Sequence, residues 1–260
     1  MNELSNLLFS IIKETDLNQK IAKAKTLADL EAEAIAPHAD VLDLKHPGRP
    51  EDFKVEDARQ LGKRGFSDLK ARATFLHAIA NIELLAIELP ALCLLRFGSD
   101  DLKYIKRQMA IIAEEAKHFS MLKDRLEVMD CEFGSLPVHN GLWDFAWRCE
   151  NEIEHQIVIP CYLEARGLDV CPEFVKKFDN IGDEASSKII QIILRDEIGH
   201  VKAGLDYLQD KSKELGVSSD ELFTKTLSRF FDDKLKSKHR LNLHARREAG
   251  FSEKKLRSLQ

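Results

Sequence analysis

At 260 residues the chain is long enough for one large or two small domains with a substantial core, which excludes a peptide hormone or a disulfide mini-protein. Hydrophobic residues make up 44% of the chain and charged residues 32%, a balance typical of a folded, helix-rich protein. The formal net charge of −5 gives the whole molecule no strong positive field for capturing polyanions.

The cysteines and the apolar segments indicate a cytoplasmic protein. The five cysteines are odd in number and show no C-x-x-C spacing, which favours a reducing compartment over a disulfide framework. The amino terminus has Glu3 before a short apolar run and lacks the basic region of a secretion signal. Glu83 and Glu88 interrupt the longest apolar stretch, which is shorter than the roughly 20 residues that a membrane span needs.

The first 66 residues are expected to form a helical arm and a linker. Residues 5–34 show the apolar spacing of one or two amphipathic helices, with Ser5 and Asp16 as candidate N-caps. Residues 37–50 are rich in proline and glycine, which predicts an extended connection.

Residues 67–216 are expected to form a bundle of four long helices. The pattern predicts helices over residues 67–97, 99–129, 142–166 and 183–215. Ser67 is the candidate cap of the first, and Gly167 is the expected end of the third. Pro160 should interrupt the backbone hydrogen bonds of the third helix.

Residues 217–260 are expected to form a basic helical extension. Ser218 and Glu221 make a capping box, and Ser252 is a candidate cap for a last short helix. From Lys234 to Arg257 there are nine Lys or Arg against two Glu, a net charge of +7. Such a segment can touch RNA, an anionic substrate or the acidic bundle itself, and a solvated or intramolecular face is the commonest case.

Two segments share a Glu-x-x-His pattern, namely Glu115 with His118 and Glu197 with His200. Three residues span almost one helical turn, so each pair places a carboxylate and an imidazole on one helix face, where both can bind one metal ion. One such pair is a weak signal. Two pairs, each among apolar neighbours, are a stronger one because buried carboxylates without partners are costly.

Each pair is preceded by a helix that carries a further Glu in apolar surroundings. Glu83 lies 32 residues before Glu115, and Glu164 lies 33 residues before Glu197, so the four helices form two matched hairpins. The 49 residues from Glu115 to Glu164 allow the long crossover of ferritin-like bundles. The predicted fold is therefore an all-α, ferritin-like four-helix bundle with N- and C-terminal helical extensions.

These six residues predict a carboxylate-bridged site for two metal ions, iron first and manganese second, because hard carboxylates with two imidazoles suit such ions. Asp196 is assigned to the free ring N–H of His118, and Glu114 to that of His200, although a solvated position suits Glu114 equally well. Glu88 is an alternative ligand. Four other side chains, which could serve the site, are more readily explained by packing: His77, His155, Tyr162 and Tyr207.

The sequence resembles an uncharacterised bacterial family of ferritin-like di-iron carboxylate proteins, distantly similar to ribonucleotide reductase small subunits and multicomponent monooxygenases. The motifs that carry the resemblance are HPGRP (46–50), FLHAIANIELLAIEL (75–89), EEAKHF (114–119), LPVHNGLWD (136–144), LEARGLDVCP (163–172), ILRDEIGHV (193–201) and LNLHARREAGFSE (241–253). The resemblance implies the same fold and the same six ligands, and no substrate.

The leading hypothesis is an O2-dependent oxidase or hydroxylase of an unknown small molecule, served by an electron donor. A tRNA-modifying hydroxylase is one version of it, motivated by the basic extension. The alternatives are an iron-sequestering protein without catalytic turnover and a metal-free helical interaction module. The sequence leaves open the substrate, the native metal and whether the chain forms a homodimer.

Overall fold

The structure is a computed structural model that describes residues 2–57, 65–231 and 240–260. Within these ranges the chain is helical, with two isolated β-bridges and no strand, so the predicted all-α class is confirmed. The chain divides into two compact units, Met1–Trp147 and Arg148–Gln260, and each is described by itself.

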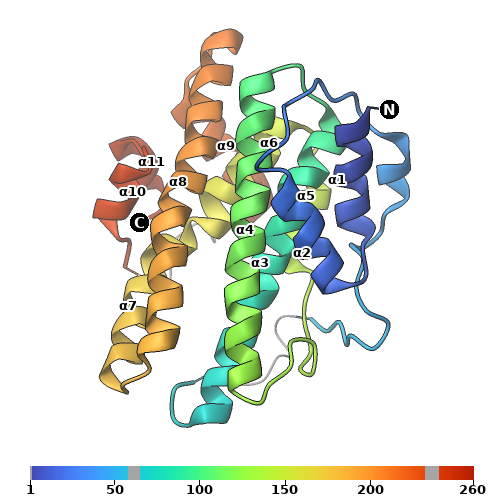
Figure 1. The fold of residues 1–260 in the computed structure, drawn as a ribbon. Coiled ribbons are helices and arrows are strands. Elements are labelled where there is room, and N and C mark those ends of the chain that lie inside the picture. Colours follow the sequence, from blue (N-terminus) through green and yellow to red (C-terminus); the bar gives the residue numbers. More distant parts are fainter. Residues whose placement is uncertain (1, 58–64, 232–239) are drawn as a thin grey trace. The chain divides into compact units, whose positions relative to one another are not determined.

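The centre of the first unit is a pair of long helices, α3 (Leu69–Phe97) and α4 (Leu102–Val128), which lie side by side in Figure 1. Asp68 caps α3 and Asp101 caps α4, because each carboxylate accepts hydrogen bonds from backbone N–H groups of the first turn. The short turn between them requires Gly98, whose φ is +71° and whose Cβ would lie 2.8 Å from a backbone carbonyl oxygen. The two helices are therefore antiparallel neighbours.

The amino-terminal segment packs on this pair. Helix α1 (Glu3–Lys13) contacts α3, and α2 (Leu17–Thr26) contacts α4. A short 3-10 helix, η1 (Ala39–Asp43), also contacts α3. Helix α5 (Gly141–Arg148) reaches the boundary of the unit, and its buried Trp143 donates from Nε1 to the carbonyl oxygen of Lys45 at 3.1 Å.

The second unit has its own helical pair, α7 (Arg166–Asn180) and α8 (Glu184–Leu215), again neighbours in Figure 1. Before α7 come α6 (Glu152–Val158) and a π-helical turn, η2 (Ile159–Glu164). Three shorter helices follow α8: α9 (Ser219–Phe231), α10 (Leu243–Glu248) and α11 (Glu253–Ser258). One apolar cluster joins these elements and includes Ile157, Cys161, Leu168, Val201, Leu205, Phe223, Phe251 and Leu256.

The third predicted helix, over residues 142–166, is wrong. Helix α5 ends at Arg148, and Asn151 caps a new helix by accepting from the backbone N–H of Glu154 at 2.9 Å. Pro160 has no N–H to donate, and the N–H of Ala165 donates to the Pro160 carbonyl five residues back, at 3.1 Å, in the π pattern. The helical path then continues through the expected stop at residue 167.

Smaller differences concern helix caps and the linker. Ser5 lies inside α1, which Asn2 caps, and Asp68 caps α3 where Ser67 was expected. The predicted caps Asp16 and Ser252 are confirmed, since both accept hydrogen bonds from first-turn N–H groups. The proline-rich linker contains the 3-10 helix η1 and is therefore not wholly extended.

Helix α3 is, by length and composition alone, the one helix in the described ranges that could cross a membrane. Of its apolar window, 83% is buried inside the structure, and the core helix of a soluble protein passes the same test. The composition of α3 is therefore weak evidence for a membrane span.

Candidate metal centre

The first unit brings Glu83 of α3 together with Glu115 and His118 of α4. The Nδ1 atom of His118 lies 3.1 Å from Oε2 of Glu115 and 3.3 Å from Oε2 of Glu83. Each residue offers one ligand atom, and these atoms all lie within 4.8 Å of one another. All three residues are buried, with exposed fractions of 7%, 2% and 0%. The predicted Glu and Glu-x-x-His of the first hairpin therefore form one compact donor set.

The helical pair explains why these three side chains meet. Glu115 and His118 lie three residues apart on one face of α4, and the antiparallel neighbour α3 brings Glu83 to the same level. Fully buried apolar side chains stand next to the donors along both helices, including Leu84, Leu85, Ile112 and Phe119. Two carboxylates in such surroundings are costly unless a cation accompanies them.

The shifted pKa values of Glu83 and His118 also indicate that this donor set favours a bound cation. Burial raises the pKa of Glu83 to about 8, and the neighbouring charge of Glu115 adds to the effect. Burial alone would lower the pKa of His118, but its hydrogen bonds to Glu115 and Glu83 outweigh burial and raise that pKa to about 11. Without a metal ion, the set therefore holds protons on both Glu83 and His118 at neutral pH, and a bound cation would take their place.

The second unit places Glu197 and His200 on one face of α8. The Nδ1 atom of His200 lies 3.2 Å from Oε2 of Glu197, and the exposed fractions are 2% and 8% respectively. The other oxygen, Oε1 of Glu197, is buried and has no hydrogen-bond partner among the described residues. A buried acceptor without a donor costs about 1–3 kcal/mol, or more when it is charged, and a metal ion is a partner that removes this cost.

Glu164 is the last residue of the π-helical turn η2 and is half-buried. Three residues later the backbone passes close to α8, because a Cβ on Gly167 would lie 3.8 Å from Cγ of Glu197. The segment that carries Glu164 thus runs beside the Glu197–His200 pair. π-helical turns are rare in proteins, and those that occur are often found at functional sites.

The structure gives the alternative ligand Glu88 a different role. Glu88 is fully buried, and its carboxylate contacts both Lys20 and Arg49, with Arg49 Nη2 at 2.8 Å from Oε2. This ion cluster joins α2 and the HPGRP segment to α3. The sequence signal for a buried cation is Lys20, which lies in the apolar stripe of α2 beside the buried Ile21.

The two residues assigned to outer positions differ in exposure. Glu114 is exposed, whereas Asp196 is mostly buried and accepts from Nε of Arg195 at 2.8 Å. Their proposed partners, His200 and His118, lie in the other unit in each case. Both pairings stay predictions.

The remaining histidine and tyrosine candidates pack within their units. His77 accepts from the backbone N–H of Gly134 at 2.9 Å and stacks on Phe133. His155 is buried in α6, the Tyr162 ring lies 4.4 Å from that of Phe231, and Tyr207 is buried in α8. Packing accounts for their positions.

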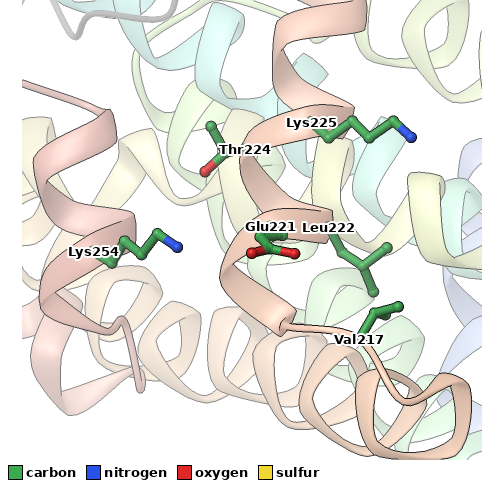
Figure 2. A pocket seen from close by; sticks show the side chains of 6 residues that line it. All are labelled: Val217, Glu221, Leu222, Thr224, Lys225 and Lys254. Carbon is green, nitrogen blue, oxygen red and sulfur yellow. The ribbon is translucent and has the colours of Figure 1, made fainter.

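The second unit also has a surface pocket of about 530 Å³ along α9 and α11. Figure 2 shows its lining: Val217, Glu221, Leu222, Thr224, Lys225 and Lys254. None of the six candidate ligands lines it, so this pocket is separate from the candidate metal centre.

Comparison with known proteins identifies a family. Residues 13–257 match the family described as "Protein of unknown function (DUF455)". The chain is also 34% identical over 215 residues to an uncharacterized protein of Haemophilus influenzae, covering 80% of this chain and 74% of that protein. No solved structure matches the chain. These matches name no ligand and no reaction.

Proposed function

We propose that this chain, which belongs to the DUF455 family, binds two metal ions through Glu83, Glu115, His118, Glu164, Glu197 and His200. The observation that carries the proposal is the donor set of the first unit, in which two buried carboxylates and one buried imidazole converge within 4.8 Å. The buried oxygen of Glu197 that lacks a hydrogen-bond partner in the described ranges supports a second donor set.

The two units carry the same pattern of candidate ligands, and this match supports a common ligand set. Each unit contains one antiparallel helical pair, and each has a Glu before a Glu-x-x-His at nearly equal spacing. A Glu from each of two helices and a Glu-x-x-His from each of the other two is the ligand set of ferritin-like di-metal proteins. The proposed architecture is therefore a ferritin-like four-helix bundle with a long crossover.

Iron is the proposed metal, with manganese second. Four carboxylates and two imidazoles are hard or borderline donors, which suit these ions better than metals that prefer thiolates. The described cysteines stand outside both donor sets, and burial raises the pKa of Cys161 so strongly that its thiol stays protonated.

The proposed activity is an O2-dependent oxidation or hydroxylation of a small molecule, with an external electron donor. Two bound redox-active ions would supply the electrons that reduce O2. The carboxylates of Glu83 and Glu115 would stabilise the positive charge of the bound ions. His118 must give up its proton when a metal binds. The apolar side chains around the donors keep bulk water away from them.

Three cations of the basic extension form ion pairs within the described part of the second unit. Arg246 pairs with Asp169, Arg247 with Glu253, and Lys255 with Asp220, all inside the second unit. Intramolecular pairing was the commonest explanation for this segment, and these three cations follow it. Lys234, Lys236 and Lys238 lie outside the described residues.

Metal analysis tests the proposal. Protein loaded with Fe(II) without oxygen is expected to hold close to two ions per chain, and His118→Ala should lose at least one of them. The control is His77→Ala, which removes another buried histidine of the same unit and should keep both ions. Folded protein that takes up neither Fe(II) nor Mn(II) would contradict the assignment.

Exposure to O2 then separates an enzyme from a storage protein. The loaded protein should oxidise about two irons per chain and stop, because an isolated bundle has no interior for a mineral. Continued uptake of many irons per chain would favour iron sequestration instead.

A further inference from the structure

The carboxy-terminal segment, Leu241–Gln260, inserts one buried arginine into the second unit. Arg246 of α10 is 2% exposed, and its Nε and Nη2 atoms donate to the two oxygens of Asp169 at 2.9 and 2.7 Å. The Nη2 atom also donates to the carbonyl oxygen of Ala165 at 3.2 Å. The guanidinium lies over the Phe251 ring at 4.8 Å. Both members of this ion pair are buried, with side-chain exposures of 2% and 1%.

The carbonyl that Arg246 binds belongs to the junction between η2 and α7. Ala165 directly follows the candidate ligand Glu164 and precedes the first residue of α7. Asn242 contacts the same junction, since its backbone N–H donates to Asp169 at 2.9 Å and its side-chain amide donates to the Leu168 carbonyl at 3.1 Å. Two of the sequence motifs, LEARGLDVCP and LNLHARREAGFSE, thus bind each other through polar contacts.

The junction needs such support because a π-helical turn is intrinsically unfavourable. Its hydrogen bonds run five residues back, and such turns are rare outside special contexts. In a helix each residue turns the side-chain direction by about 100°, so a return to α-helical spacing would point Glu164 elsewhere. The direction of Glu164 therefore depends on whether the π turn persists.

We propose that Arg246 is a positioning residue for Glu164, which holds the η2–α7 junction in the π-helical form in which this carboxylate serves the metal centre. The inference rests on the proposed metal-binding function. It also gives the carboxy-terminal segment a role, because α10 and Asn242 together fix the backbone on which one ligand is carried.

The first test measures backbone exchange in the metal-free protein. Arg246→Lys keeps a positive charge beside Asp169 but cannot donate to Asp169 at two points and to Ala165 as well. We expect faster hydrogen exchange at residues 161–168. The matched control is Lys255→Met, which removes another buried cation of the same segment, one that binds Asp220 and Ser219 instead. Its exchange should rise around α9 and α11 and stay unchanged at the junction.

The second test measures metal binding with Mn(II) and anaerobic Fe(II). Arg246→Lys should lower the affinity for one of the two ions by roughly 10–100-fold, the usual effect of losing a partner that orients a ligand. Glu164→Gln should lower the affinity for the same ion. Because Arg246 acts through Glu164, the double variant should bind metal no worse than Glu164→Gln alone. Lys255→Met should bind both ions as the parent does.

The outcomes separate this inference from the function on which it rests. A parent protein that binds no metal overturns the proposed function. A parent that binds two ions, with Arg246→Lys binding them equally well or the double variant showing additive losses, overturns the positioning role alone. If Arg246→Lys fails to fold, the pair Arg246→Gln with Asp169→Asn leaves no unpaired buried charge, and the same measurements decide the matter.

Discussion

At the scale of single residues, the buried carboxylates of this chain differ in whether a cation of the protein accompanies them. Glu88 has Lys20 and Arg49, and Glu154 has Arg229 at 2.6 Å. Glu197 has the imidazole of His200 at 3.2 Å, and its Oε1 atom has no hydrogen-bond partner among the described residues. Carboxylates of the first kind stabilise the fold. Burial of a carboxylate of the second kind is costly unless a cation from outside the chain binds it.

Glu197→Gln tests this distinction by removing the charge with almost no change of shape. We expect metal affinity to fall by more than the roughly 10–100-fold that the loss of an outer partner costs. The free energy of unfolding of the metal-free protein should stay equal or rise, because a buried charge has been removed. Metal titration and urea unfolding of the metal-free protein measure the two effects.

Glu154→Gln is the matched control with the opposite expectation. Glu154 is 9% exposed and pairs with the half-exposed Arg229, so its substitution should lower the free energy of unfolding by about 1 kcal/mol. Its metal binding should equal that of the parent. If Glu197→Gln instead destabilised the metal-free protein and left metal affinity intact, Glu197 would be a structural carboxylate.

At the scale of elements, the π-helical turn η2 is held from α8 as well as from the carboxy-terminal segment. The backbone of α8 passes so close to η2 at Gly204 that a Cβ there would lie 2.9 Å from Cys161 Sγ and 3.1 Å from Pro160 Cγ. Only glycine fits this contact without a shift. The close approach fixes the position of the turn against the helix that carries Glu197 and His200.

Gly204→Ala should therefore destabilise the second unit although alanine favours helices. We expect a loss of about 1–3 kcal/mol, typical of overpacking, with weaker binding of one metal ion. Thermal unfolding and metal titration measure these effects. Gly167→Ala is the control, because its Cβ would meet its nearest neighbours at 3.8 and 4.0 Å, an ordinary contact distance. A stabilised Gly204→Ala variant with normal metal binding would show that the contact is not needed.

The helices that the sequence predicts well are those decided by local signals. Apolar periodicity and capping residues predict α3, α4 and α8 nearly to their ends. The third predicted helix fails because its path depends on distant residues: Pro160 is accommodated against Gly204, and Arg246 binds the junction that follows. Such contacts have no signature within the segment itself.

The site was predictable in part for the same reason. Spacing within one hairpin places Glu83, Glu115 and His118 together, and the structure brings them within reach of one another. Lys20 in the apolar stripe of α2 signals a buried cation, but its pairing with Glu88 could not be predicted, since the two cations of the cluster come from segments 39 and 68 residues away in the chain. Long-range pairing of charges depends on tertiary packing, which periodicity does not report.

At the scale of the whole molecule, each compact unit holds one half of the proposed ligand set. The first, Met1–Trp147, carries Glu83, Glu115 and His118, and the second, Arg148–Gln260, carries the other three. Metal binding by either half would stabilise the unit that carries it, because a ligand stabilises every state that it requires to be folded. The division into an arm, a bundle and an extension stays a prediction.

The buried ion cluster links the amino-terminal arm to the core of the first unit and makes its stability depend on pH. Burial lowers the pKa of Lys20 to about 8, although the attraction of Glu88 opposes this effect. Its Nζ atom also contacts the carbonyl oxygens of Ile12 and Gly48, at 3.3 and 3.2 Å. Arg49 remains on Glu88 when Lys20 loses its proton.

Between pH 8 and about 10.5, the unfolded chain keeps the proton on Lys20 whereas the folded chain releases it, so the free energy of unfolding should rise with pH across this window. The contribution is at most about 3 kcal/mol, since each pKa unit is worth about 1.4 kcal/mol. Urea unfolding of the metal-free protein at pH 7 and pH 10 measures it, with Lys20→Met as the comparison because it removes the titrating group and leaves the Arg49–Glu88 pair. The parent should gain stability relative to Lys20→Met as the pH rises. A constant difference between the two proteins would show that Lys20 does not titrate in this window.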